Sequence, residues 1–128
     1  MTIAFYCVLF ASFMPLLWVV FAKYYAGFKL RDNANPRELL GNATGVAQRA
    51  NWAQANSWEA LTPFAAAVII ASIVGVDQLK LDIASGLFIF TRLLHGIFYL
   101  SNHHQLRSLV WFLGITCVLY IYFQAALL

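Results

Sequence analysis

The chain has 128 residues, of which 62% are hydrophobic and only 10% are charged. Soluble domains carry roughly 25% charged residues, so this composition excludes a water-soluble globular protein and predicts an integral membrane protein. The net charge of +3 comes from basic residues that lie between long apolar runs. That placement indicates membrane orientation rather than nucleic-acid binding.

Four apolar runs follow one another along the chain, and a helix needs about 20 residues to cross a bilayer core. We expect spans at residues 2–22, 45–76, 83–100 and 108–128, joined by a long polar loop at 27–44, a short turn at 77–82 and a third connection at 101–107. Because little chain remains outside the spans, we expect one domain, residues 1–128. The predicted fold is an all-α membrane protein, a bundle of four transmembrane helices.

The second span has an unusually polar first half, QRANWAQANSWEALTPF, with no helix breaker before Pro63. We expect this helix to start in the headgroup region and to carry its polar face inward as it descends. Pro15 lies inside the first span, where a membrane helix tolerates proline if neighbouring groups satisfy the freed carbonyl. The first apolar run lacks the basic start and the cleavage site of a signal peptide, so we read it as a retained helix.

Basic residues are distributed unevenly among the connections. Six lie in or next to the first and third connections: Lys23, Lys29, Arg31, Arg37, Arg49 and Arg107. The middle turn contains Lys80 alone. The positive-inside rule then places the first and third connections in the cytoplasm, and both termini on the opposite side.

Arg92 lies in the middle of the third span, where an arginine costs about 2.5–3.5 kcal/mol on insertion scales. It must face protein or water and find an anion. Glu59 is the only carboxylate inside the predicted core of a span. Two interpretations follow: a structural Arg92–Glu59 ion pair, or a polar pocket for a charged ligand. We favour the pocket because the polar groups are too many for one ion pair.

Helical spacing groups these polar residues on two faces, since residues three, four or seven apart share a face. Arg49, Asn56 and Glu59 follow this spacing on the second span, and Arg92, His95 and Tyr99 follow it on the third. Facing each other, the two stripes would suit a ligand with carboxylates, an ammonium group and amides.

Other groups that could carry chemistry have a simpler explanation. His103 and His104 are adjacent in sequence and point in different directions on a helix. Cys7 and Cys117 lie in apolar runs, without a CxxC motif. We interpret the histidines as interfacial residues and the cysteines as small apolar side chains, and we expect no metal site.

The two motifs resemble those of the MAPEG family, the membrane-associated proteins in eicosanoid and glutathione metabolism. The first runs Arg49-Ala50, Asn56-x-x-Glu59, Pro63-Phe64, and the second Arg92-x-x-His95-x-x-x-Tyr99, followed by QLR at 105–107. The resemblance covers most of the chain, because the four spans and the long first loop also match.

This resemblance implies a homotrimer with glutathione as co-substrate at each subunit interface, and no nucleic-acid partner. Members conjugate glutathione to lipophilic electrophiles, reduce lipid hydroperoxides or isomerise lipids. By similarity, Arg107 would be the catalytic residue that favours the thiolate. Six residues would hold glutathione: Arg49, Asn56, Glu59, Arg92, His95 and Tyr99.

The chain departs from the glutathione-active members in several places, including a Tyr99–Arg107 segment one residue longer than in the leukotriene-synthesising branch, and comes nearer to the bacterial members, which implies a bacterial inner-membrane location. Trp52 stands where active members often have an arginine, and His95 where the leukotriene-synthesising branch has a tyrosine. We therefore expect a microsomal-type glutathione transferase or peroxidase, with a non-catalytic membrane scaffold or lipid-binding protein of the same fold as the alternative. A small transporter has less support, because no inverted repeat appears. The sequence does not identify the lipophilic substrate.

Overall fold

The computed structural model describes all 128 residues, and every regular element in it is helical. Four helices are long and apolar enough to cross a membrane. They are α1 (Ile3–Tyr25), α3 (Gly45–Val74), α4 (Gln78–Leu100) and α5 (His104–Ala126). The prediction of an all-α protein with four spanning helices is therefore confirmed.

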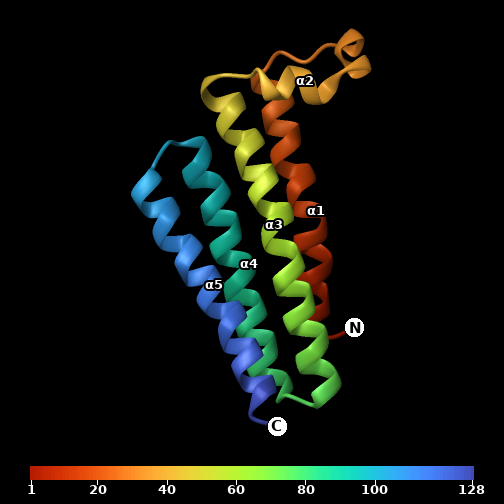
Figure 1. Cartoon of the computed structure of the whole chain (residues 1–128), viewed down its shortest axis with the longest axis vertical. Helices are drawn as coiled ribbons and strands as arrows, with labels where there is room; N and C mark the ends of the chain where they lie inside the picture. Colours follow the sequence, from red (N-terminus) through yellow and green to blue (C-terminus); the bar gives the residue numbers. More distant parts are fainter.

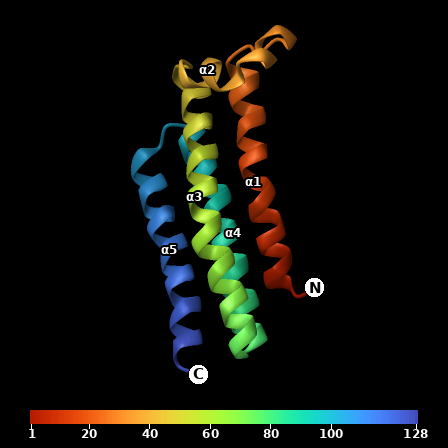
Figure 2. The ribbon, with the colours of Figure 1, turned by 45° about the vertical axis from the view of Figure 1, so that its right-hand side comes forward.

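The four helices run alternately up and down in one bundle (Figures 1 and 2). α3 packs mainly on α1, and α5 packs mainly on α4. The α1–α3 and α4–α5 connections lie at one end, here called the loop end, whereas both termini and the α3–α4 turn lie at the other, the termini end (Figure 1). The two basic connections thus share one end of the bundle, as expected; its cytoplasmic location stays a prediction.

Two connections are more ordered than the sequence predicted. The expected loop at 27–44 contains a 3-10 helix, η1 (Leu30–Ala34), and a short helix, α2 (Pro36–Gly41). Pro36 stands at the first position of α2, where a missing N–H removes no helical hydrogen bond. The expected turn at 77–82 is mostly helix, because the Asp77 side chain accepts a hydrogen bond from the Lys80 N–H at 3.1 Å and starts α4 early. α5 likewise begins at His104 rather than at residue 108.

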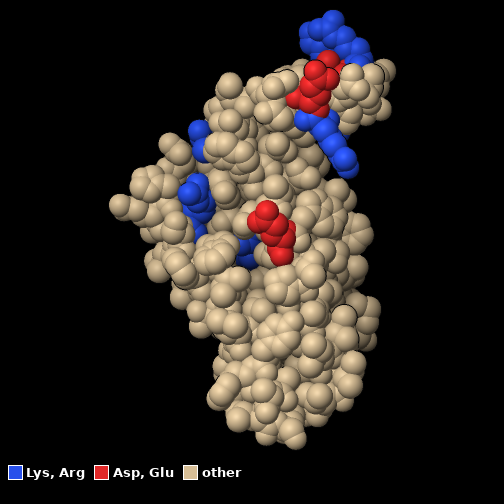
Figure 3. Space-filling model, viewed as in Figure 1, with Lys and Arg blue, Asp and Glu red and all other residues tan.

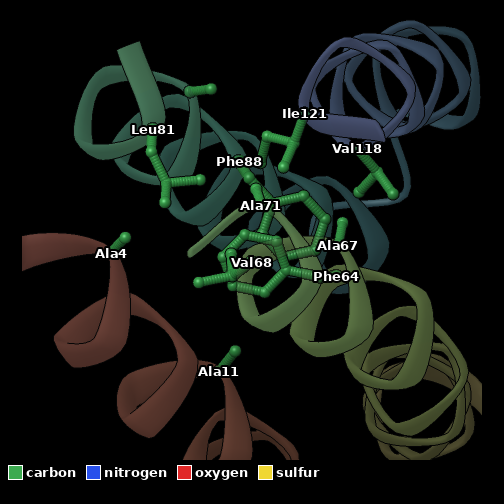
Figure 4. Packing of buried hydrophobic residues seen from close by; sticks show 11 residues of the cluster. Ala4, Ala11, Phe64, Ala67, Val68, Ala71, Leu81, Phe88, Val118 and Ile121 are labelled. Carbon is green, nitrogen blue, oxygen red and sulfur yellow. The ribbon is translucent and has the colours of Figure 1, made fainter. Parts of the chain in front are cut away.

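Aromatic rings and small residues make the core of the bundle (Figure 4). Phe64 of α3 stacks on Phe88 of α4, with ring centroids 3.9 Å apart and the planes inclined by 15°. Five buried alanines belong to the same core cluster: Ala4, Ala11, Ala67, Ala71 and Ala84. Lipid tails are as apolar as leucine, so membrane helices associate through close packing of small residues rather than through the hydrophobic effect. The alanines allow that close approach.

Asp82 ties α1 to α4 at the termini end. Its Oδ1 accepts hydrogen bonds from the Ala4 backbone N–H at 2.8 Å and from the Gln78 amide at 2.7 Å. The first N–H groups of a helix have no partner within the helix, and a carboxylate is favourable at the positive end of the helix dipole. Asp82 therefore caps α1 from the first turns of α4.

Trp18 of α1 packs directly on Gly96 of α4. Trp18 is 3% exposed, and a Cβ added to Gly96 would overlap its indole ring. Only a residue without a side chain fits at position 96. Because Gly96 is next to His95 in the sequence, this contact also fixes the position of α4 and of its polar residues relative to α1.

We expect Gly96→Ala to lower the free energy of unfolding by about 1–3 kcal/mol, the usual range for overpacking, because Trp18 would have to move. Gly86→Ala is the matched control on the same helix, since an added Cβ there meets no atom within 4 Å. It should be neutral or slightly stabilising. Thermal unfolding in detergent compares the two variants, and equal melting temperatures would contradict a tight Trp18–Gly96 contact.

Candidate functional site

Arg92 is buried in the middle of α4 with 3% of its surface exposed. Its Nη2 donates a hydrogen bond to Oδ1 of Asn56 on α3 at 2.7 Å. Its Nε is buried and has no hydrogen-bond partner. The guanidinium is therefore held between α3 and α4 by one of its five N–H donors, and its other N–H groups have no partner in the chain at a depth where no lipid can satisfy them.

Glu59 connects to Arg92 only through Asn56. The Asn56 amide nitrogen donates to Glu59 Oε2 at 3.0 Å while its oxygen accepts from Arg92. The direct Arg92–Glu59 ion pair, the less favoured of the two interpretations, does not form: the one ion pair in the chain joins Arg31 and Asp32. Glu59 is exposed on α3, one turn from Asn56, so the amide reaches both charges. We call Arg92, Asn56 and Glu59 the polar relay.

A cavity of about 120 Å³ opens beside the polar relay. Helices α3, α4 and α5 line it with Asn56, Glu59, Ala60, Pro63, Phe88, Arg92, Trp111, Gly114 and Ile115. Trp111 and Gly114 of α5 were missed in the sequence, although they follow the predicted Arg107 by four and seven residues and so share its helix face. Gly114 allows α5 to approach closely, because an added Cβ would come 2.9 Å from Thr91 Oγ1.

Three further predicted residues, His95, Tyr99 and Arg107, form a row that continues from the polar relay toward the loop end. His95 is 3% exposed and its Nδ1 has no partner. The His95 and Tyr99 rings meet edge to face with centroids 5.1 Å apart. The Arg107 guanidinium carbon lies 4.4 Å from the centre of the Tyr99 ring. Arg107 at the start of α5 thus reaches the same face of α4, and cation–π attraction holds it there.

Arg49 contacts the last turn of α4 rather than the polar relay. Its Nε donates to the Tyr99 carbonyl at 3.0 Å and its Nη2 to the Leu100 carbonyl at 3.1 Å. The last carbonyls of a helix lack intrahelical partners, and a cation is favourable at that end of the dipole. Arg49 therefore caps α4 and fixes Tyr99 at the same time. Trp52, one turn further along α3, is 48% exposed.

The structure thus brings the predicted site residues into one continuous row along α4. Glu59, Asn56 and Arg92 form its deep end, and Tyr99 with Arg107 and Arg49 forms its end near the loops. Charged side chains lie in the half of the bundle toward the loop end on the face shown in Figure 3, and the half toward the termini is uncharged there. Such a row can bind a carboxylate at Arg92, an ammonium group at Glu59 and an anionic sulfur near Arg107.

We expect Asn56→Ala to destabilise the protein by about 1.5–3 kcal/mol, because a hydrogen bond to a charged group has that value and Arg92 would lose its only partner. Asn51→Ala on the same helix is the control: its amide donates a longer bond, 3.4 Å, to the Leu40 carbonyl. Its loss should be about 0.5–1.5 kcal/mol. Thermal unfolding in detergent compares them, and a larger loss in Asn51→Ala would contradict the relay.

Comparison with known proteins identifies the family. The family model for MAPEG matches residues 3–127, nearly the whole chain, including both motifs and all four long helices. No curated protein and no solved structure matches the chain. The match agrees with the resemblance that the motifs of α3 and α4 indicated. The chain therefore belongs to the MAPEG family and is an integral, multi-pass membrane protein.

Proposed function

We propose that this protein binds glutathione along the row from Glu59 to Arg107 and uses its thiol on lipophilic electrophiles or lipid hydroperoxides. The observation that carries the proposal is Arg92, which is buried at mid-span, held by Asn56 and left with a free Nε. Asn56 is a neutral partner, so the positive charge of Arg92 has no anion in contact with it within the chain. A guanidinium with an open donor suits a carboxylate.

The chemistry of glutathione matches the remaining groups. The tripeptide carries two carboxylates, one ammonium group, two amides and a thiol. The exposed Glu59 carboxylate suits the ammonium group, and the Asn56 amide can bond to the peptide. With the glutamyl end at the relay, the thiol lies toward Tyr99 and Arg107. A guanidinium beside a thiol favours the thiolate, which is the nucleophile.

The reaction then follows from the thiolate. In a transferase reaction its sulfur forms a bond to an electrophilic carbon, and the displaced group leaves with its electron pair. In a peroxidase reaction two glutathione molecules reduce a hydroperoxide to an alcohol and water and become a disulfide. Either substrate dissolves in lipid, so we propose that it enters from the bilayer between helices.

The size of the cavity supports a site shared between subunits. About 120 Å³ is available beside the relay within one chain, whereas ligand pockets usually measure about 300–1,000 Å³. Glu59 and Trp52 are exposed on the adjoining face of α3. A bound tripeptide would extend over this face, and an exposed carboxylate within the membrane needs cover by protein or water.

The outer face of α3 is uncovered within one chain and carries polar residues. Residues alternate at steps of four and three along the whole helix: Gln48, Trp52, Ala55, Glu59, Thr62, Ala66, Ile69 and Ile73, none of them buried within the chain. Gln48, Glu59 and Thr62 are polar, and polar side chains on a membrane helix favour contact with protein over lipid. We therefore propose that the α3 helices meet in a homotrimer and that glutathione binds where this face is covered.

One observation favours a non-catalytic role instead. Arg49 uses two of its nitrogens to cap α4. Trp52 occupies the position where glutathione-active members often have an arginine. The site therefore has fewer free cations than the motifs suggest. A scaffold that keeps the row for packing would need no thiolate. The two functions predict different results when glutathione binding and thiolate formation are measured on the purified protein.

We expect the detergent-purified protein to bind glutathione by calorimetry and to produce the ultraviolet absorbance of its thiolate. Arg107→Ala should abolish the thiolate signal, Arg107→Lys should retain part of it, and Arg31→Ala, whose side chain is 80% exposed, should not change it. Glutathione binding without a thiolate signal in the wild type would mean that the protein does not activate the thiol for the transferase or peroxidase reaction. No binding at millimolar glutathione would favour the scaffold.

Glu59→Gln tests the ammonium contact. We expect it to weaken glutathione binding about 10- to 100-fold, the range for loss of a charge-assisted hydrogen bond. The melting temperature should not change, because glutamine has the same shape and its amide oxygen can still accept the hydrogen bond from Asn56. Glu38→Gln, also exposed but on α2, should leave binding unchanged. Loss of the oligomer with unchanged binding would show that Glu59 serves assembly instead.

A further inference from the structure

A separate cavity of about 370 Å³ lies at the loop end between α1, α2 and α3. It is lined by Val19, Lys23, Pro36, Arg37, Leu40, Asn51 and Gln54. It shares no residue with the cavity beside the polar relay. We call it the interfacial cavity.

The interfacial cavity presents hydrogen-bond donors and positive charge without a matching anion. Lys23 and Arg37 line it, and no acidic residue does. Neither cation forms an ion pair, because the one ion pair of the chain joins Arg31 and Asp32. The Lys23 ammonium lies 4.4 Å from the centre of the Phe28 ring, a contact that leaves its N–H donors available.

The amide groups of the cavity are also largely unused. Gln54 is half-buried and forms no side-chain hydrogen bond within the chain, and Asn51 donates one long bond, 3.4 Å, to the Leu40 carbonyl. Two cations and two amides around one space have the chemistry of a site for a phosphate or carboxylate.

The depth of the cavity indicates where such an anion comes from. α1 has 23 residues, about 35 Å at 1.5 Å per residue, slightly more than the hydrocarbon core of about 30 Å. Lys23 lies in its last turn, followed by the exposed Tyr24 and Tyr25, and such aromatic residues mark the headgroup level. The cavity therefore opens at the depth of lipid phosphates, with Val19 and Leu40 as its apolar wall.

We propose that the interfacial cavity binds the phosphate of an anionic membrane phospholipid. Lys23 and Arg37 neutralise the phosphate, Asn51 and Gln54 hydrogen-bond to the headgroup, and the first methylenes of an acyl chain pack on Val19 and Leu40. A soluble anion could meet the same cations but would gain nothing from that apolar wall. The lipid would hold α2 against α1 and α3 and so order the first connection.

The test is lipid titration of the delipidated, detergent-solubilised protein by native mass spectrometry, with phosphatidylglycerol and with phosphatidylcholine. We expect phosphatidylglycerol to bind more tightly. The double variant Lys23→Gln/Arg37→Gln should lose about 25-fold in that affinity, since each basic residue near a lipid surface contributes roughly fivefold. Lys29→Gln/Arg31→Gln removes the same charge from the same end outside the cavity, and should change it little.

Three results would overturn the proposal. Equal losses in both double variants would mean that general attraction, not a site, retains the lipid. Unchanged phosphatidylglycerol affinity in Lys23→Gln/Arg37→Gln, with loss of glutathione binding, would assign the cations to glutathione. If inorganic phosphate at an equal concentration displaced phosphatidylglycerol as well as the lipid itself does, the apolar wall would play no part in binding. Lys23→Arg/Arg37→Lys changes the same two side chains but keeps both charges, and it should retain the affinity for phosphatidylglycerol. Retained affinity in this variant would show that the loss in Lys23→Gln/Arg37→Gln comes from the missing charges and not from misfolding.

Discussion

The bundle depends on how it accommodates one arginine in the middle of a membrane span. Arg92 is 3% exposed and finds its partner in an amide, Asn56, at 2.7 Å. An amide can accept from the guanidinium and donate to Glu59 at the same time, so one residue links a buried cation to an exposed anion. A direct ion pair would have neutralised both charges inside the chain. The relay instead separates them, and the separation leaves an anion on the outer face of α3 and a free donor inside.

The rest of the packing serves to bring the helices close enough for this relay. Alanines at the Phe64–Phe88 stack, Gly96 under Trp18 and Gly114 beside Thr91 all remove side-chain volume between helices. In lipid this closeness is itself the source of stability, because apolar surface gains little by leaving one hydrocarbon environment for another. The same small residues therefore hold the fold together and set the distance between α3, α4 and α5, across which the polar groups meet.

Much of this arrangement is predictable from the sequence, and the failures have physical reasons. The four spans follow from apolar length, and the stripes on α3 and α4 follow from helical spacing. The start of α4 at Gln78 was missed because hydropathy locates the apolar run, whereas the Asp77 cap starts the helix earlier. Spacing placed Arg49 beside Asn56 on one face but could not show that its guanidinium would reach the α4 carbonyls. Gly114 and Trp111 were missed because an apolar helix with one glycine gives no polar signal.

The position of the charges links the two proposals through one physical argument. The unpaired cations of the loop end, Lys23 and Arg37, lie at headgroup depth, whereas Arg92 lies at mid-span and Arg107 lies between the two levels on α5. Positive charge therefore continues from the interface into the bundle, and Glu59 is the one carboxylate within that path. Such a field attracts a ligand of net negative charge from water and favours the orientation in which its single ammonium group goes deepest, toward Glu59. Glutathione has that charge pattern. A phospholipid at the interfacial cavity would neutralise the outermost cations and leave the deeper ones for the tripeptide, so the two ligands need not compete for the same charges.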